Sequence, residues 1–115
     1  MKPGKFEIWI ADLNPQFGTE AGKTRPVLIV QTNALNRVHP STLICPMTSN
    51  IKPESKILWV NINKGVAGVK EDFDVMIDQL RAIDNRRLIS RIGILPLEIG
   101  ELVTSNLKIV LDLYD

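Results

Sequence analysis

The sequence contains very few of the side chains on which disulfides, metal sites and histidine chemistry depend. Cys45 is the only cysteine among 115 residues, so neither an intrachain disulfide nor a multi-cysteine zinc site can form, as is usual in a reducing compartment. His39 is the only histidine, which excludes a two-histidine acid–base pair within one copy of the chain. Metal, phosphate-loop and dinucleotide motifs are absent. Enzymatic hypotheses are therefore confined to arginine, hydroxyl and carboxylate chemistry.

Excess charge and long apolar runs are absent as well. The formal net charge is only +1, so any affinity for nucleic acid must come from a local patch. No apolar stretch approaches the length of a membrane span, and the first residues lead into a strand-like pattern rather than a targeting segment. At 115 residues and 44% hydrophobic, the chain can form one domain with a real core. We expect a single cytoplasmic domain over residues 1–115, with no membrane contact.

Most of the chain has the apolar periodicity of strands. Residues 6–11 alternate in polarity, which predicts a half-buried strand, and the β-branched run 27–31 predicts a strand covered on both faces. Shorter patterns predict further strands over residues 42–47, 56–62, 73–77, 81–83 and 88–92. Cys45 is expected to be inert in the first of these.

Helical spacing is confined to a possible turn over residues 33–38 and to the end of the chain. From Pro96 onward apolar residues recur at helical spacing, and proline suits the first position of a helix. The pattern predicts a mainly β fold with some α, in which a small, strongly bent antiparallel sheet or half-open barrel packs against a C-terminal helix.

One arginine stands out because of its position. The polar loop 16–24 delivers Arg25 directly before the apolar run, and Pro26 restricts Arg25 to extended conformations. A guanidinium fixed at a strand edge can hold a phosphate without a metal. The alternative is an ion pair with Asp12 or Glu20, worth ~1 kcal/mol or less if exposed.

Six segments in order resemble the MazF/PemK family of toxin endoribonucleases; they are residues 7–9, 12–15, 18–20, 23–31, 46–49 and 78–84. The resemblance covers nearly the whole chain. It implies an SH3-like half-open barrel shared with gyrase-poisoning CcdB toxins, a homodimer, and sequence-specific cleavage of single-stranded mRNA without a cofactor. It also implies a MazE/PemI-like antitoxin whose acidic C-terminal segment blocks the RNA groove.

The resemblance assigns catalytic roles to three residues. Arg25 resembles the family's catalytic arginine, which binds the nonbridging phosphate oxygens and is a candidate donor of the leaving-group proton. Thr48 resembles the phosphate-contacting threonine, with a turn-stabilising hydroxyl as the alternative. Glu20 is a candidate general base or a group that orients Arg25, with a solvated loop glutamate as the alternative. Metal-free cleavage uses the neighbouring 2′-hydroxyl and leaves 2′,3′-cyclic phosphate and 5′-hydroxyl ends.

Six more residues are expected to contact RNA: Ser49, Asp78, Gln79, Arg81, Lys23 and Arg87. Asp78 and Gln79 end an expected strand, and a salt bridge between Asp78 and Arg81 is an equal alternative. The positive cluster 81–91 could track phosphates or be only a solvated face.

Aromatic side chains offer further candidates for RNA contact. Trp9 and Trp59 could stack on bases, although a core or rim position is more usual for Trp9. Phe17 replaces a histidine proposed to act in some PemK-like members, which places more weight on Arg25.

Two other functions are open on the same fold. The first is a CcdB-like gyrase inhibitor that acts by binding protein, although residues 113–115 differ from the Trp-Gly-Ile end of those toxins. The second is a catalytically inactive barrel that only binds a partner. The presence of Arg25, Thr48 and Glu20 favours the ribonuclease over both.

Overall fold

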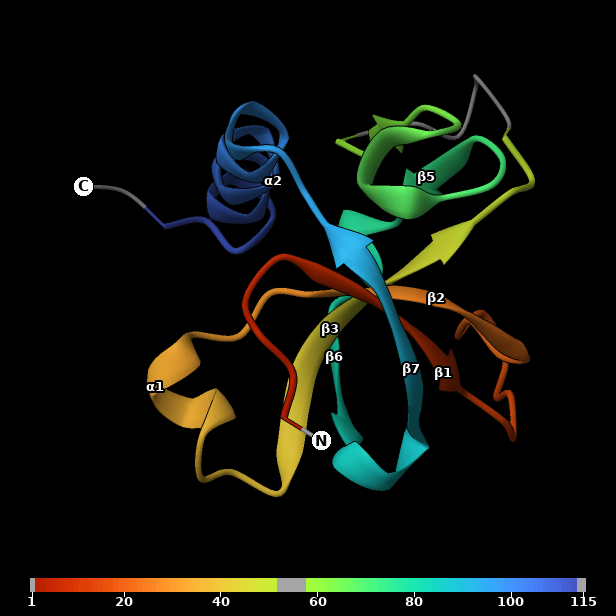
Figure 1. Ribbon diagram of the computed structural model, residues 1–115, viewed down its shortest axis with the longest axis vertical. Helices are drawn as coiled ribbons and strands as arrows, with labels where there is room; N and C mark the ends of the chain where they lie inside the picture. Colours follow the sequence, from red (N-terminus) through yellow and green to blue (C-terminus); the bar gives the residue numbers. More distant parts are fainter. Residues whose placement is uncertain (1, 52–57, 114–115) are drawn as a thin grey trace.

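The fold is a curled antiparallel sheet with one helix packed against it (Figure 1). The structure is a computed structural model that describes residues 2–51 and 58–113. Its elements in chain order are β1 (Glu7–Asp12), β2 (Thr24–Ile29), α1 (Asn33–Asn36), β3 (Ser41–Thr48), β4 (Val60–Ile62), η2 (Val66–Gly68), β5 (Phe73–Val75), η3 (Ile77–Gln79), β6 (Arg81–Asp84), η4 (Asn85–Arg87), β7 (Leu88–Ile94) and α2 (Leu97–Val110). The predicted bent sheet with a C-terminal helix is confirmed.

The sheet bends where β3 changes its partner. The strand order is β4-β5-β3-β2-β1-β7, and β6 also pairs with β3. Ser41–Ile44 of β3 pair with β6, whereas Met47 and Thr48 pair with β5. Pro46 lies between the two pairings, and proline has no N–H for a ladder, so it suits the point where one partner ends and the next begins. The pairing of β1 with β7 contains two register shifts, which add curvature.

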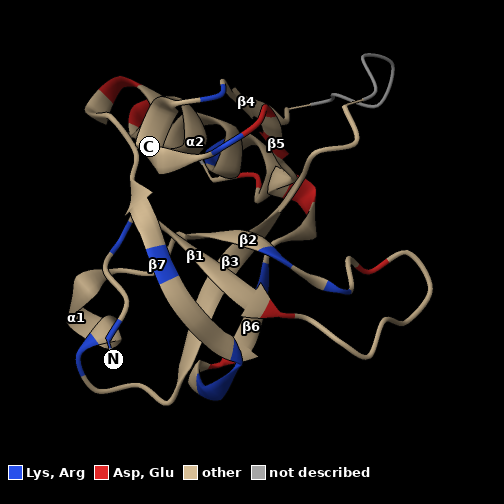
Figure 2. Cartoon of the chain, turned by 45° about the vertical axis from the view of Figure 1, so that its right-hand side comes forward, with Lys and Arg blue, Asp and Glu red and all other residues tan. Residues whose placement is uncertain are grey.

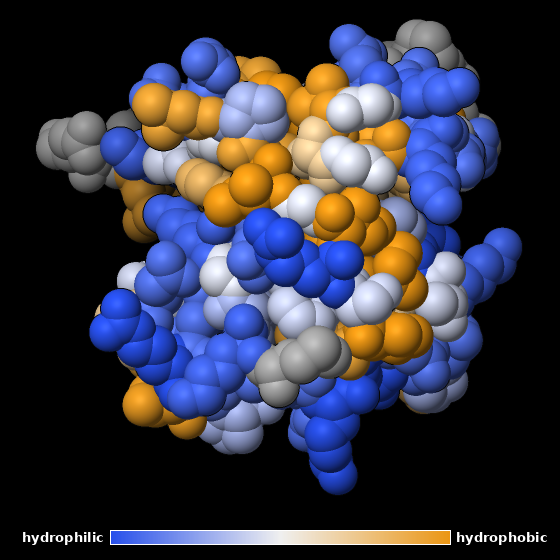
Figure 3. Space-filling model, viewed as in Figure 1, coloured by the Kyte–Doolittle hydropathy of each residue, from blue (hydrophilic) through white to orange (hydrophobic). Residues whose placement is uncertain are grey.

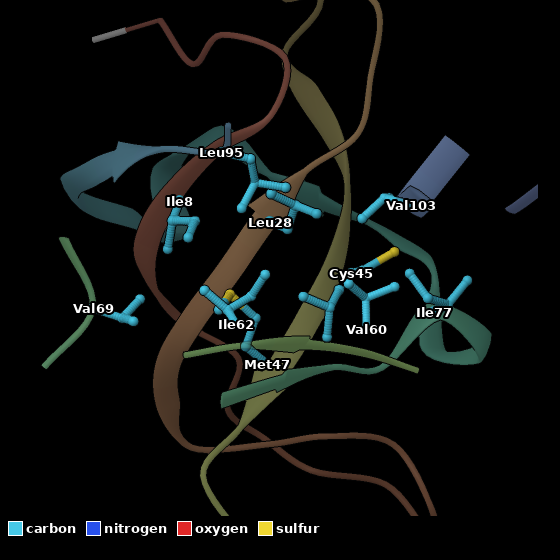
Figure 4. Close-up of a cluster of buried hydrophobic side chains, with 11 residues drawn as sticks. Ile8, Leu28, Cys45, Met47, Val60, Ile62, Val69, Ile77, Leu95 and Val103 are labelled. Atoms are coloured by element: carbon cyan, nitrogen blue, oxygen red, sulfur yellow. The ribbon is translucent and has the colours of Figure 1, made fainter. Parts of the chain in front are cut away.

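The curled sheet encloses apolar side chains on both of its faces. Leu28 of β2 joins the cluster drawn in Figure 4, which also receives Val103 from α2. Val27 and Ile29, which point the other way, join a second cluster inside the curl. The prediction that this run is covered on both faces is therefore confirmed.

The prediction that β1 is half-buried is wrong. Ile8 is buried in the first cluster, and Trp9 and Ala11 are buried in the second. A flat sheet would leave one of these faces in water, but the curl covers both. The alternation of polarity in β1 therefore does not mark a solvent face.

The strand boundaries differ from the sequence patterns in several places. β2 begins at Thr24 and ends at Ile29 rather than spanning 27–31. β5 ends at Val75, so the expected strand end at Ile77 is wrong and a 3₁₀ turn follows instead. β4 begins at Val60 because Leu58 has a positive φ of 65°, which breaks an extended strand. Residues 56 and 57 of that expected strand lie outside the described residues.

The C-terminal helix begins close to the position that the sequence predicts. Pro96 is the N-cap rather than the first helical residue, so α2 begins one residue later than expected. In the described ranges 2–51 and 58–113, no helix combines the length and the apolar character needed to cross a membrane.

Cys45 is fully buried, and burial, assisted by the charge of Asp78, raises the pKa of its thiol to about 12. A thiol of this kind is inert at neutral pH, as expected.

A substitution at Gly93 can test how closely β7 packs against the η2 turn. A Cβ at this position would lie 2.2 Å from the carbonyl oxygen of Ala67, which is backbone and cannot rotate away. Gly93→Ala should lower the free energy of unfolding by roughly 1–3 kcal/mol, as overpacking does. Denaturant unfolding measures the change, and Ser90→Ala, at an exposed position of the same strand, should have little effect. Equal stability of the two variants would show that β7 and η2 are not in close contact.

Candidate active site

The end of β2 and the end of β3 form one hollow that contains Arg25 and Thr48. Val27 and Pro46 form the last pair of the register between β2 and β3, and Arg25 and Thr48 each lie two residues beyond that pair. The hollow has a volume of about 430 Å³ and is lined by Lys23, Thr24, Arg25, Pro26, Met47, Thr48, Ser49, Asn50 and Phe73. Four residues expected at the site therefore share it: Arg25, Thr48, Ser49 and Lys23.

The Arg25 guanidinium is held by backbone carbonyl groups. Its Nε donates to the oxygen of Gly22 at 2.7 Å, and its Nη1 lies 3.4 Å from the oxygen of Met47. Among the described residues no carboxylate pairs with it, so neither proposed ion pair, with Asp12 or with Glu20, is present. Burial lowers the pKa of Arg25, but a guanidinium remains protonated at neutral pH. The hollow therefore holds a half-buried cation whose charge is not neutralised by a side chain.

Thr48 lies at the last position of β3, as predicted, and its hydroxyl has a local partner. The oxygen Oγ1 accepts from the backbone N–H of Asn50 at 3.1 Å, which is the turn-stabilising contact considered as the alternative role. A hydroxyl that accepts one hydrogen bond still has its own proton to donate. The contact to Asn50 therefore orients the hydroxyl without preventing it from binding an anion in the hollow.

A second hollow holds the other expected acid–base and RNA-contacting residues. Its volume is about 300 Å³, and it is lined by Thr19, Glu20, Asp78, Gln79, Leu80 and Arg81. Glu20 lines this hollow and not the one that contains Arg25. Ala21 and Gly22, which follow Glu20 in the chain, are buried although the rest of the loop is exposed. The structure therefore brings Glu20 together with Asp78, Gln79 and Arg81 but does not bring it into contact with Arg25.

Asp78 and Gln79 lie on the turn η3, so the expectation that they end a strand is wrong. Asp78 accepts a hydrogen bond from Nε1 of Trp59 at 2.7 Å, and the alternative salt bridge to Arg81 is not formed. Gln79 bonds the loop: its Oε1 accepts from the N–H of Ala21, and its Nε2 donates to the oxygen of Thr19. Both residues are thus engaged within the described part of the chain.

The positive cluster on β6, η4 and β7 is mostly engaged in internal contacts. Arg86 pairs with Asp84, and its hydrogen bonds lower the pKa of that carboxyl to about 2. Arg91 pairs with Glu7 at 2.8 Å. The two remaining arginines bond loop carbonyls: Nη1 of Arg81 lies 3.4 Å from the oxygen of Ala21, and Nη1 of Arg87 donates to the oxygens of Asp12 and Asn14.

The positive charges in this region do not form a single patch. Figure 2 shows basic positions at the loop end of β2 and at the turn between β6 and β7. Arg87 lies in a third hollow, which also contains Asp12, Asp84, Arg86 and Ile89. The two places are therefore lined by different sets of residues.

Side chains that could stack on RNA bases differ in exposure. Trp9 is only 3% exposed and donates to Glu7, so it is a core residue. Trp59 is half-buried beside Asp78. Phe17, 71% exposed, lies in the loop between β1 and β2. His39 is an exposed turn residue, as predicted, and its Nδ1 lies 3.0 Å from the oxygen of Ser41.

Among the residues that line the Arg25 hollow and were not named as site residues from the sequence, two come from outside β2 and β3. Phe73 reaches it from β5, and Asn50 from the loop after β3. Phe73 is distant in sequence from Arg25 and is brought near it only by the pairing of β3 with β5, which no local pattern shows. In the described ranges, no group of three His, Cys, Asp or Glu side chains is placed to hold a metal ion.

The fold and the hollow define a small half-barrel protein with a half-buried cation at one end of its sheet. Residues 4–111 match the family described as PemK-like, MazF-like toxin of type II toxin-antitoxin system, so the chain belongs to that family and the expected assignment is confirmed.

The similarity to known relatives extends over most of each chain. The chain is 33% identical over 109 residues to Endoribonuclease EndoA of Bacillus subtilis, covering 95% of this chain and 94% of that protein. The crystal structure of MazF from Deinococcus radiodurans has a TM-score of 0.85 at 26% identity, covering 98% of this chain and 99% of that one. A MazE-MazF structure from the same organism has a TM-score of 0.76 at 25% identity, covering 99% of both chains.

The bond between Trp59 and Asp78 can be tested against a second tryptophan in the same molecule. Asp78→Ala removes the acceptor of the Trp59 indole N–H, whereas the indole N–H of Trp9 keeps Glu7 at 3.0 Å. Hydrogen exchange of the Trp59 indole, followed by NMR, should become about tenfold faster, as the loss of one hydrogen bond implies. The Trp9 signal should not change. An unaltered Trp59 signal would show that Asp78 is not its partner.

Proposed function

We propose that this chain is the toxin of a type II toxin–antitoxin pair and acts in the cytoplasm as a metal-independent, sequence-specific endoribonuclease on single-stranded mRNA. The family assignment and the relation to Endoribonuclease EndoA support the class of enzyme. The observation that carries the proposal is Arg25, a half-buried cation without a carboxylate partner among the described residues, which shares one polar hollow with Thr48.

This pair suits the charge that develops when a phosphodiester is attacked. The neighbouring 2′-oxygen bonds to phosphorus, the bond to the 5′-oxygen breaks, and a proton passes from the first oxygen to the second. Two negative oxygens develop on the phosphorane between these events. Arg25 can bind these two oxygens with the guanidinium N–H groups that do not bond Gly22. The Thr48 hydroxyl can donate its proton to one of the same oxygens in a hydrogen bond. The products are a 2′,3′-cyclic phosphate and a 5′-hydroxyl.

The second hollow contains the residue that we propose as the general base of this reaction. Glu20 is the candidate general base for the 2′-hydroxyl, in the hollow that it shares with Asp78, Gln79 and Arg81. Because it does not line the Arg25 hollow, a bound RNA has to span both hollows for Glu20 to act. Lys23 and Ser49 border the phosphate site itself, whereas Arg87, on η4, bonds the carbonyl oxygens of Asp12 and Asn14 at the start of the loop between β1 and β2.

An antitoxin partner is supported by solved relatives. Structures of MazF from Deinococcus radiodurans contain MazE, and a mycobacterial endoribonuclease is described in complex with its cognate antitoxin. We propose that a MazE/PemI-like antitoxin places an acidic C-terminal segment in the hollows, where its carboxylates replace the RNA phosphates at Arg25. The gyrase-inhibitor alternative has no comparable observation in its favour.

Cleavage of single-stranded RNA in the presence of EDTA tests the proposal directly. The native chain should cleave, and Arg25→Ala should reduce the rate by about 10²–10³-fold because it removes the donors to the developing charge. Thr48→Val, which keeps the shape of the side chain but removes its proton, should also lower the rate.

Arg37→Ala provides a matched control for the loss of one arginine. Arg37 is exposed beside α1, on the opposite side of the molecule from the loop end of β2 (Figure 1), so its loss should leave the rate unchanged. Lack of cleavage by the native chain, or equal cleavage by Arg25→Ala, would contradict the proposal. Inhibition of gyrase supercoiling instead would favour the CcdB-like alternative.

A homodimer is proposed from the apolar side chains that α2 leaves exposed. Leu102 and Ile109 are 50% and 62% exposed and lie seven residues apart on the same side of the helix. Figure 3 shows that apolar atoms are gathered on the face of the molecule that includes α2. Light scattering should give twice the 12.9 kDa chain mass for the native protein and the single mass for a Leu102→Glu, Ile109→Glu variant. A native mass of one chain would contradict the dimer.

A further inference from the structure

Gln79 makes a pair of hydrogen bonds to the loop between β1 and β2 that resembles the pairing of two strands. Its Nε2 donates to the oxygen of Thr19 at 3.0 Å, and its Oε1 accepts from the N–H of Ala21 at 3.0 Å. These two backbone groups flank a single residue, Glu20. One side-chain amide therefore fixes the backbone on both sides of the candidate base.

The same short segment also holds Arg25. Directly after Ala21, the carbonyl of Gly22 accepts from Nε of Arg25 at 2.7 Å, the shorter of the two bonds that orient the guanidinium. Gly22 is tightly confined, since a Cβ added to it would lie 2.5 Å from Cβ of Gln16. A shift of Ala21 is therefore passed on to the group that orients Arg25.

Burial makes this segment the fixed point of an otherwise exposed loop. Residues 14–20 and 23–24 are exposed, whereas Ala21 is 8% exposed and belongs to the apolar cluster inside the curled sheet. The N–H of a buried residue needs a partner, and Gln79 supplies the one for Ala21. Ala21 also receives a longer contact at 3.4 Å from Arg81, which bonds its oxygen.

From these contacts we infer that Gln79 is a positioning residue, which clamps Thr19 and Ala21 and so holds both Glu20 and Arg25 in the geometry needed for cleavage. The inference rests on the proposed function for its catalytic part only. In this arrangement both polar groups of the Gln79 side chain are used by the loop, so its main contribution is to the rate of the chemical step rather than to RNA affinity.

The chain contains a matched control, because Gln31 makes the same pair of bonds elsewhere. Its Nε2 donates to the oxygen of Ser41 and its Oε1 accepts from the N–H of Leu43, which together flank Thr42. The same Nε2 also donates to Oδ1 of the buried Asn36 at 3.0 Å. Ser41 and Leu43 belong to the part of β3 that pairs with β6, and none of these residues lines the Arg25 hollow or the Glu20 hollow. Gln31→Leu therefore removes a comparable pair of backbone bonds, together with the bond to Asn36, outside the candidate site.

Amide hydrogen exchange, measured by NMR on the RNA-free protein, tests the clamp without reference to activity. In Gln79→Leu the Ala21 N–H should exchange roughly tenfold faster, while the Leu43 N–H keeps its native rate. Gln31→Leu should show the reverse. Gln79→Glu, whose side chain has nearly the same shape, keeps the acceptor for Ala21 but loses the donor to Thr19. The exchange rate of the Ala21 N–H in this variant should therefore be intermediate. Native protection of Ala21 in Gln79→Leu would overturn the clamp.

Steady-state cleavage of RNA tests the catalytic part. Gln79→Leu should lower kcat on the order of 10²-fold with KM nearly unchanged, because the reacting groups are misplaced while the surface that binds RNA remains. Gln31→Leu should keep the native kcat. A raised KM with native kcat would overturn the positioning role and make Gln79 a direct RNA contact. If the native chain cleaves no RNA, the proposed function fails, and the exchange of Ala21 by itself decides the clamp.

Discussion

The antiparallel register between β2 and β3 is the constraint on which the core and the candidate site both depend. The pairing of Val27 with Pro46 sends alternate side chains of β2 into two apolar clusters, one under α2 and one inside the curl. Just beyond the last pair of this register, Arg25 and Thr48 line one hollow. A slip by one residue would turn the apolar side chains to the wrong faces and would also separate these two. Packing therefore stabilises the geometry of the site.

The cation at the strand end is kept available by the way it is held. A carboxylate partner would neutralise the charge of Arg25. The carbonyl oxygens of Gly22 and Met47 instead orient the guanidinium without neutralising its charge. Partial burial removes water from the cation, which strengthens its attraction for an incoming phosphate. The buried segment of the loop between β1 and β2 supplies one of these carbonyls, that of Gly22. This loop therefore forms part of the candidate site. Chemistry and fold are thus coupled through backbone groups.

Local patterns in the sequence predicted most of the strands, the C-terminal helix and the place of Arg25 near the start of a strand, because periodicity and proline act within a few residues. They did not predict that β1 is buried on both faces, since this depends on the curl of the whole sheet. Nor did they separate Glu20 from the Arg25 hollow, because the distance between them depends on how Ala21 and Gly22 pack. Phe73 was missed for the same reason, as it reaches the hollow only through the pairing of β3 with β5.

The central claim is that Arg25 and Thr48 stabilise attack by the neighbouring 2′-oxygen on phosphorus. A single 2′-deoxynucleotide on the 5′ side of the cleaved phosphate removes that nucleophile and leaves every other contact in place. We predict that the native chain cleaves an all-ribose oligonucleotide and leaves the singly substituted one intact at that bond. Cleavage of both at the same rate would show that water or another group attacks, and would contradict the assignment of these residues.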